Sequence, residues 1–240
     1  MKIAIIGYGK MGHEIEKMAL ANGHEVVVKL DNKPMSDKDI EDFTTAEVAI
    51  EFSEPEAAVN NFNMCFNMGI PVVSGTTGWL DHYDEIRKLC IDGNHSFFYS
   101  PNFSLGVNLF FEINRKLAKL MNKYDNYDIN VSEVHSKDKL DIPSGTAIRI
   151  AEDICENTTN IDNWSFNDKD NKDSISIKSG RENNVIGNHT VNYESDVDSI
   201  ELTHKAKNRK GFATGAIVAA EFLINRKGFC EMKDLLGFGE

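Results

Sequence analysis

The chain has 240 residues, of which 41% are hydrophobic and 27% are charged, as in an ordinary globular protein of one or two domains. Its formal net charge of −12 argues against a nucleic-acid partner, which needs a broad basic face. No apolar run approaches the roughly 20 residues that cross a bilayer, no secretory pattern opens the sequence, and the four cysteines form no C-x-x-C pair. We therefore expect a cytoplasmic protein with no membrane partner, no disulfide framework and no metal.

The first 31 residues have the order of a dinucleotide-binding unit. The apolar run 2–6 predicts a strand buried on both faces of a parallel sheet, and residues 7–12 read Gly-Tyr-Gly-Lys-Met-Gly. An amphipathic helix is expected next, then a second strand over 26–30 that ends at Asp31. This strand–glycine turn–helix–strand–acid order is typical of NAD(P)-binding domains. The alternative is a glycine turn with a structural role.

Each part of this unit has a physical task. Gly7 permits the tight turn, Gly9 lets a pyrophosphate approach the backbone, and the Asp31 carboxylate can accept hydrogen bonds from ribose hydroxyls. Asp31 would repel a 2′-phosphate, which favours NADH. Lys29 and Lys33 flank it and could offset that repulsion, so NADPH stays open.

Three more strands are predicted in this half, over residues 48–52, 71–74 and 97–99, after a polar loop with a short helical turn over 32–46. Ser53 is expected to cap the following helix, with Glu56 closing a capping box. Glu51 is expected to be paired at that helix N-terminus rather than catalytic.

Two loops lie at the carboxyl ends of these strands, where parallel sheets bind ligands. Gly75-Thr76-Thr77-Gly78 could approach the nicotinamide and its ribose, and the alternative is a plain turn. Phe103, after the last strand, could pack near the nicotinamide, and the alternative is core packing.

From residue 105 the pattern changes. A helix is predicted over 105–121, and alternating strands near 127–134, 175–177, 190–193 and 200–202 surround a polar stretch at 156–173. An apolar helix from about 211 is expected to return to the first sheet. The predicted fold class is α/β: a Rossmann-type doubly wound parallel sheet plus a second α+β domain with a mostly antiparallel sheet. Residues 1–104 and 209–240 would form the dinucleotide-binding domain and 105–208 the substrate-binding domain.

The stretch from His135 to Thr146 concentrates groups suited to an acidic molecule. His135 ends a predicted strand, and Lys137 and Lys139 follow on a short turn. Pro143-Ser144-Gly145-Thr146 then opens a helix, whose unpaired N–H groups and dipole can hold an anion. We expect a site for a small acidic substrate here, and the alternative is a solvated turn. His189 and His204 lie on predicted strands and are expected to be structural.

Taken together, these residues resemble those of the 4-hydroxy-tetrahydrodipicolinate reductase (dihydrodipicolinate reductase) family of diaminopimelate and lysine biosynthesis. The resemblance spans nearly the whole chain. It rests on the glycine turn 7–12, Gly75-Thr76-Thr77-Gly78, residues 102–108, Glu133-Val134-His135, residues 139–147 and His204-Lys205-Ala206.

The resemblance implies an NADH- or NADPH-dependent reduction of a small cyclic dicarboxylate by a homotetramer, whose second domain also carries the assembly contacts. His135 would donate a proton and Lys139 would be the second catalytic residue. Ser136, Ser144, Gly145 and Thr146 would bind the substrate. The cofactor contacts would be Gly7, Tyr8, Gly9, Lys10, Met11, Gly12, Asp31, Gly75, Thr76, Thr77, Ser100, Pro101, Asn102 and Phe103.

One departure from the family pattern concerns the turn after His135. Many members have a second histidine there and more basic residues before the lysine, whereas this chain has Ser136, Lys137 and Asp138. Asp138 removes positive charge near a dianion, which bears on substrate affinity more than on reaction type. Two alternatives remain: another nicotinamide dehydrogenase of similar layout, and a non-catalytic nucleotide-binding protein.

Overall fold

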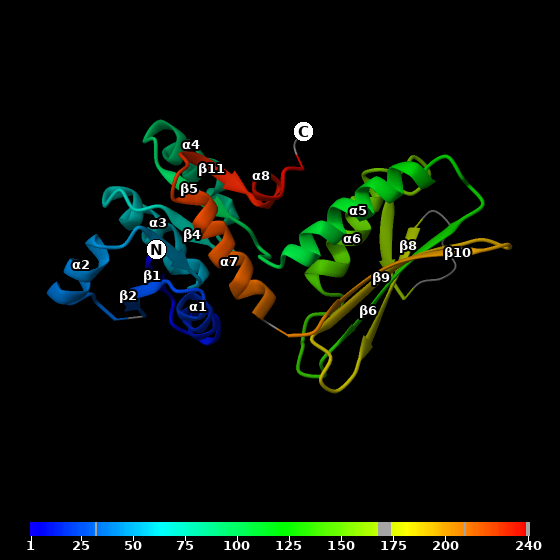
Figure 1. Ribbon diagram of the computed structural model, residues 1–240. Coiled ribbons are helices and arrows are strands. Elements are labelled where there is room, and N and C mark those ends of the chain that lie inside the picture. The colour runs from blue at the N-terminus through cyan, green and yellow to red at the C-terminus, as the bar shows by residue number, and fades with distance from the viewer. Residues whose placement is uncertain (32, 168–173, 209, 239–240) are drawn as a thin grey trace. The chain divides into compact units, whose positions relative to one another are not determined.

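The computed structural model describes residues 1–31, 33–167, 174–208 and 210–238. Expectations for the end of the polar stretch 156–173, for Arg209 and for the last two residues lie outside this part. The chain divides into two units, which we call unit 1 (Met1–Leu105 with Lys210–Glu240) and unit 2 (Gly106–Arg209) (Figure 1). The functional roles expected of the two segments stay predictions. No helix of the described chain has the length and apolar character to cross a membrane.

Unit 1 is built on a six-stranded sheet in which every pairing is parallel. The strand order is β11-β5-β4-β3-β1-β2. The bounds are β1 (Lys2–Ile6), β2 (Glu25–Leu30), β3 (Val48–Glu51), β4 (Val72–Ser74), β5 (Ser96–Tyr99) and β11 (Gly228–Glu231). The helices are α1 (Lys10–Ala21), α2 (Asp37–Thr44), α3 (Pro55–Asn67), α4 (Tyr83–Asp92), α7 (Lys210–Leu223) and α8 (Met232–Leu236), with a 3₁₀ turn at Leu80–His82.

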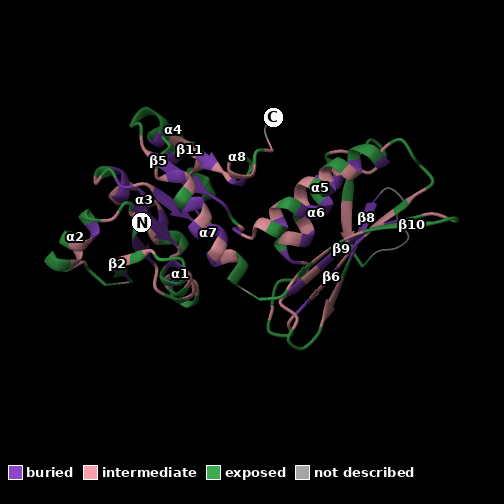
Figure 2. Ribbon diagram, viewed as in Figure 1, coloured by how far each residue is buried: buried purple, intermediate pink, exposed green. Residues whose placement is uncertain are grey.

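Two apolar cores lie on the two faces of this sheet. In Figure 2 the buried strands of the sheet lie between helices. On β1, Ile3 and Ile5 belong to the core under α1 and α7, whereas Ala4 and Ile6 belong to the core under α2, α3 and α4. A strand that is apolar at every position therefore serves both faces. The predicted Rossmann-type sheet is confirmed, and α7 returns to contact β3, β4 and β5 as expected.

Two local predictions for unit 1 need correction, and one strand of its sheet was not predicted. The polar stretch after β2 contains the eight-residue helix α2, because Ser36 and Asp39 form a capping box at its N-terminus. Helix α3 has Glu54 rather than Ser53 at its N-cap, because the Ser53 hydroxyl donates to Glu51 instead. The edge strand β11 was not predicted.

Unit 2 packs helices α5 (Leu105–Met121) and α6 (Gly145–Cys155) against a five-stranded sheet, with core residues that include Phe110, Val131, Ile150, Ile177 and Val191. The strand order is β10-β9-β6-β8-β7. The strands are β6 (Asp128–His135), β7 (Asn163–Phe166), β8 (Ser174–Arg181), β9 (Gly187–Glu194) and β10 (Ser199–Ala206).

The second sheet is mixed rather than mostly antiparallel. Strand β9 pairs antiparallel with β6 and β10, but β8 runs parallel to both β6 and β7. Helix α6 lies between β6 and β8 in the chain, and such a crossover brings the chain back to start the next strand at the same end of the sheet. The short strand β7 was not predicted because it lies in the polar stretch.

Candidate active site

Strand β6 places two ionisable side chains on the core face of the second sheet. Its buried positions alternate, with Val131, Glu133 and His135 facing inward at 0%, 2% and 7% exposure. Strand β9 adds His189, which pairs directly opposite Glu133 in the antiparallel register. The apolar face of the sheet thus ends in a carboxylate and two imidazoles, which we call the Glu-His-His cluster (Glu133, His135 and His189).

Each side chain of the Glu-His-His cluster brings one atom close to one atom of each of the other two. The Nε2 atom of His135 lies 3.2 Å from Oε2 of Glu133 and 3.2 Å from Nε2 of His189. The Nε2 atom of His189 lies 3.6 Å from the same carboxylate oxygen. On the other side of its ring, His135 Nδ1 lies 3.0 Å from the carbonyl of Ile186. A carbonyl oxygen can only accept a hydrogen bond, so Nδ1 is the donor. Nε2 is then the ring nitrogen that can exchange a proton.

The other carboxylate oxygen of Glu133 is fully engaged. The Ser144 backbone N–H donates to Oε1 at 3.0 Å, the Ser179 hydroxyl donates to it as well, and Arg181 Nη1 lies 3.8 Å away. Burial raises the pKa of Glu133, but hydrogen bonds from His135, His189, Ser144 and Ser179 outweigh it and hold that pKa well below its usual range. Burial lowers the pKa of His189. The buried cluster therefore carries a negative charge at Glu133.

Helix α6 begins beside this cluster. Ser144 is its N-cap, and the Ser144 hydroxyl accepts from the Ala147 N–H at 3.2 Å and lies 3.3 Å from His189 Nε2. The backbone N–H groups of Gly145 and Thr146 have no acceptor among the described residues, and open space surrounds the position of a Cβ at Gly145. The structure thus brings predicted residues Ser144 and His135 together through His189, next to a free helix N-terminus that suits an anion.

The turn between β6 and α6 is shaped by an arginine at the end of β8, to which the sequence alone assigned no role. Arg181 donates to the carbonyls of Lys139 and Asp141, at 3.4 and 2.8 Å. The Lys139 ammonium pairs with the Asp141 carboxylate at 2.7 Å, and this hydrogen bond lowers the pKa of Asp141. Ser136 donates to Asp138 at 3.3 Å. Lys139 is therefore a cation held by an exposed partner.

The predicted glycine turn lies at the topological switch point of the first sheet, where β2 flanks β1 on one side and β3 on the other. Gly7 has φ +86°, and a Cβ there would lie 2.0 Å from the Phe52 carbonyl oxygen. A Cβ at Gly12 would lie 2.4 Å from the Gly7 carbonyl oxygen, whereas one at Gly9 would meet nothing within 4 Å. Gly7 and Gly12 thus allow tight packing, and Gly9 leaves open space.

Asp31 follows β2 and is exposed. Its neighbour Lys29 is engaged elsewhere: the ammonium lies 2.9 Å from Glu16 Oε1 and 4.9 Å from the centre of the Tyr8 ring. The Tyr8 hydroxyl also donates to Glu16. In this Tyr8–Glu16–Lys29 contact, the carboxylate of Glu16 balances the positive charge of the lysine that lies two residues before Asp31.

Predicted cofactor residues after β4 and β5 have mixed settings. Thr76 is buried, and its hydroxyl donates to Glu51 at 2.9 Å and accepts from the Ser53 N–H at 2.8 Å, so Glu51 is paired as expected. Ser100 is buried and donates to the Asn102 carbonyl at 2.7 Å. The Phe103 ring is 1% exposed within the core, which agrees with the core-packing alternative. Any cofactor contact of these two loops is left to their backbone and to exposed side chains such as Thr77.

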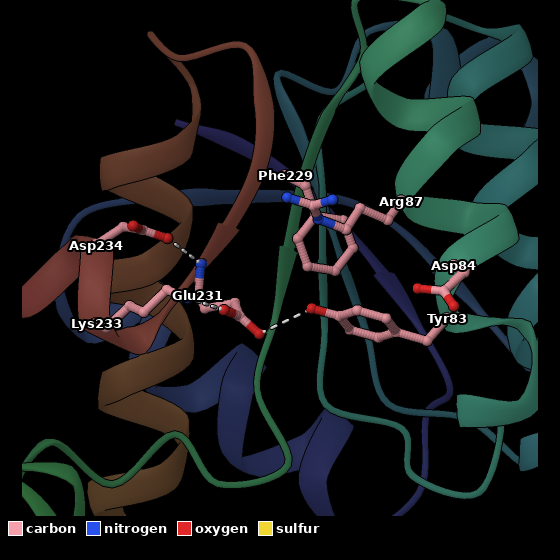
Figure 3. Close-up of a pocket in the computed structure, with 7 residues that line it drawn as sticks. All are labelled: Tyr83, Asp84, Arg87, Phe229, Glu231, Lys233 and Asp234. Carbon is pink, nitrogen blue, oxygen red and sulfur yellow. Dashed lines mark hydrogen bonds and ion pairs between the residues drawn. The ribbon is translucent and has the colours of Figure 1, made fainter. Parts of the chain in front are cut away.

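A separate surface pocket of about 510 Å³ lies at the β11 edge of unit 1 (Figure 3). It is lined by Tyr83, Asp84, Arg87, Phe229, Glu231, Lys233 and Asp234. The Tyr83 hydroxyl donates to Glu231 at 3.0 Å, and the Glu231 N–H donates to Asp234 at 2.7 Å. The pocket contains none of the predicted site residues, and β5, β4 and β3 lie between β11 and β1 in the sheet.

Comparison with known proteins identifies the family. The family model described as dihydrodipicolinate reductase, N-terminus, matches residues 1–103, and the model described as dihydrodipicolinate reductase, C-terminus, matches residues 106–236. The chain belongs to the dihydrodipicolinate reductase family. The prediction of a pyridine-nucleotide-dependent reductase of lysine biosynthesis is thereby confirmed.

Individual relatives agree with this membership. A 4-hydroxy-tetrahydrodipicolinate reductase of Christiangramia forsetii is 49% identical over 236 residues, which cover 98% of each chain. One from Staphylococcus aureus is 34% identical over 250 residues, covering 98% of this chain and 100% of the relative. A dipicolinate-bound dihydrodipicolinate reductase from Paenisporosarcina sp. TG-14 has the same fold, with a TM-score of 0.78 at 24% identity over 96% of this chain and 97% of that one.

Proposed function

We propose that this reductase converts 4-hydroxy-tetrahydrodipicolinate into tetrahydrodipicolinate, with NADH or NADPH as reductant. The net reaction adds one hydride and one proton to the substrate and releases one water. The observation that supports a catalytic site in unit 2 is the buried Glu-His-His cluster next to the free N-terminus of α6.

We assign cofactor binding to the glycine turn of unit 1. The open space at Gly9 and the exposed carboxylate of Asp31 suit a pyrophosphate and a ribose, respectively. When bound, the reduced nicotinamide supplies the hydride. Because Lys29 is held by Glu16, that lysine does not offset the negative charge of Asp31, which favours NADH, whereas Lys33 still follows Asp31 in the chain and keeps NADPH open.

We assign proton donation to His135. Its Nδ1 is fixed by the Ile186 carbonyl, so Nε2 is the atom that delivers a proton as negative charge develops on the substrate ring. Glu133 accepts a hydrogen bond from protonated Nε2 and orients the ring. Glu133 and His189 are therefore positioning residues.

We assign the substrate carboxylates to the groups around the start of α6. The free N–H groups of Gly145 and Thr146 lie at the positive end of the helix dipole and can hold one carboxylate. The Lys139 side chain is 30% exposed, and it leaves Asp141 to pair with a carboxylate of the substrate. There its positive charge stabilises the negative charge that develops on the substrate ring. Ser136 and Ser144 can add hydroxyl contacts.

The decisive test is a substitution of His135. His135→Gln should lower kcat by about 100-fold or more with a modest change in KM, because general acid catalysis contributes about 10²–10⁴ to the rate. The assay is substrate-dependent oxidation of NADH and NADPH against freshly generated substrate. Activity within about twofold of wild type would make His135 a packing residue, and no substrate-dependent oxidation by the wild type would leave the non-catalytic alternative.

We also propose that the chain acts as a cytoplasmic homotetramer. Strand β10 is an edge of the described sheet, and two apolar side chains are exposed near its start: Val197 in the preceding turn (83%) and Ile200 on the strand (38%). The unpaired backbone N–H and C=O groups of an edge strand can pair with a strand of another chain. Light scattering during size exclusion would test it, and a monomer at micromolar concentration would contradict it.

A further inference from the structure

The Glu-His-His cluster also has the donor set of a metal site. Two imidazole nitrogens and one carboxylate oxygen, all within 4.8 Å of one another and all buried, come from two adjacent strands. Nitrogen and carboxylate oxygen are ordinary ligands of Zn²⁺, and two histidines with one glutamate form a known type of three-ligand zinc site.

The distances within the cluster agree with one tetrahedral ion. Zinc–nitrogen and zinc–oxygen bonds of about 2.0–2.1 Å give ligand atoms that lie about 3.3–3.4 Å apart along the edges of a tetrahedron. The three edges observed are 3.2, 3.2 and 3.6 Å. The Ser144 hydroxyl lies 3.3 Å from His189 Nε2, a further edge of similar length. The side chains therefore need little movement to receive an ion.

The hydrogen bonds around the cluster leave His135 Nε2 and Glu133 Oε2 as the atoms that can bind a metal ion. The Nδ1–H of His135 is donated to the Ile186 carbonyl, so once Nε2 gives up the proton that it shares with Glu133, the ring presents a lone pair at Nε2 to the ion. Such a hydrogen bond on the second ring nitrogen is the usual support of a metal-bound histidine. Glu133 uses Oε1 for Ser144 and Ser179, while Oε2 is buried and has no partner among the described residues except the two imidazoles.

We propose that the Glu-His-His cluster binds one transition-metal ion of the Zn²⁺ class, with His135 Nε2, His189 Nε2 and Glu133 Oε2 as protein ligands. The fourth position is left to water or to the Ser144 hydroxyl. An ion at this place occupies the nitrogen of His135 that delivers the proton, so metal binding and catalysis exclude each other. This second statement, inhibition, rests on the proposed function, whereas the binding site itself does not.

A titration without substrate tests the site directly. The full-length protein, freed of metal with a chelator, is titrated with Co²⁺, whose visible absorption becomes intense in tetrahedral sites, and Zn²⁺ is then added to displace it. We expect saturation at one ion per chain, with no thiolate-to-cobalt charge-transfer band, since none of the cysteines belongs to the cluster. Absence of saturable binding at one equivalent would overturn the proposal.

Variants assign the ligands. His189→Gln and Glu133→Gln should each weaken Co²⁺ binding by at least about tenfold, because even an outer-shell change costs that much. His82→Gln is the matched control, since His82 is an exposed histidine that pairs with Glu85. Circular dichroism establishes that each variant is folded. Equal affinity in wild type and in both folded variants would place the ion elsewhere and overturn the assignment.

An activity measurement separates this inference from the reductase function. One equivalent of Zn²⁺ should abolish substrate-dependent NADH oxidation, the chelator should restore it, and the same excess of Mg²⁺ should leave it unchanged. Stoichiometric Zn²⁺ binding without loss of activity would overturn the exclusion and, with it, the role of His135 Nε2. An active enzyme that binds no Zn²⁺ would refute the metal site and leave the reductase function intact.

Discussion

The two glycines at the start of the nucleotide turn should respond in opposite ways to the same substitution. At Gly7 a Cβ would lie 2.0 Å from the Phe52 carbonyl oxygen, and the backbone has φ +86°. At Gly9 a Cβ would meet nothing within 4 Å, and φ is −84°. Gly7→Ala should therefore damage folding, whereas Gly9→Ala should leave the fold intact and obstruct only a ligand that approaches the backbone there.

The magnitudes follow from the geometry. A left-handed backbone costs an alanine about 1–3 kcal/mol, and moving the end of β3 away from the new methyl group costs about 1–3 kcal/mol more. Gly7→Ala should thus lower the free energy of unfolding by about 2–6 kcal/mol and Tm by at least about 4 °C in a chain of this size. Gly9→Ala removes a good N-cap residue of α1 and should cost at most about 1 kcal/mol.

Nucleotide affinity gives the opposite ranking. A methyl group on Gly9 separates a pyrophosphate from the backbone, and loss of one hydrogen bond to a charged group costs about 1.5–3 kcal/mol, or about tenfold or more in Kd. Thermal unfolding and titration with NADH and NADPH measure both quantities on each variant. If Gly9→Ala binds both nucleotides within about twofold of wild type, the pyrophosphate does not approach this turn and the cofactor assignment is refuted.

Three further substitutions test other parts of the site. Asp31→Ala should raise kcat/KM with NADPH relative to NADH, since a carboxylate repels a 2′-phosphate; an unchanged ratio would exclude contact with the ribose. Ser144→Ala should lose about 1 kcal/mol of stability with the N-cap of α6, and Ser144→Gly only a few tenths; equal losses in a denaturant titration would contradict this role. Glu133 has a pKa below its ordinary value of 4.5, so it stabilises the fold above that pH and loses this effect as the pH falls through the folded pKa. The stability gap between wild type and Glu133→Gln should accordingly narrow from pH 7 to pH 3.5, and a constant gap would count against a charged Glu133.

The first unit could be predicted in detail because its signals are local. Strand β1, the glycine turn, α1, β2 and Asp31 follow one another within 31 residues, so the order alone specifies their arrangement. Ser53 shows the limit of local reasoning. It has the residue type and position of an N-cap, but its hydroxyl donates a hydrogen bond to the buried carboxylate of Glu51 instead. Competition by a tertiary partner is not visible in the sequence around a helix start.

The second unit hid its site for a related reason. His189 is 54 residues from His135, and only the antiparallel register of β6 with β9 places it opposite Glu133. Pairing partners of strands are non-local, which also explains why the parallel strands of this sheet were missed. A signal was nevertheless present: along β6 the core-facing positions run from Val131 to Glu133 and His135, so the buried face changes from apolar to ionisable at its end.

That change bears on what the cluster is for. Burying a carboxylate and two imidazoles costs free energy, and apolar side chains of similar volume at such places are often neutral or stabilising. The chain instead surrounds Glu133 with donors from β6, β8, β9 and the start of α6, so the cost of desolvation is met when the protein folds. Dipoles and charges fixed in advance need no reorganisation when a proton moves or an ion binds. Stability alone does not require this arrangement, but chemistry at His135 Nε2 does. The polar end of this sheet therefore has a functional rather than a structural reason.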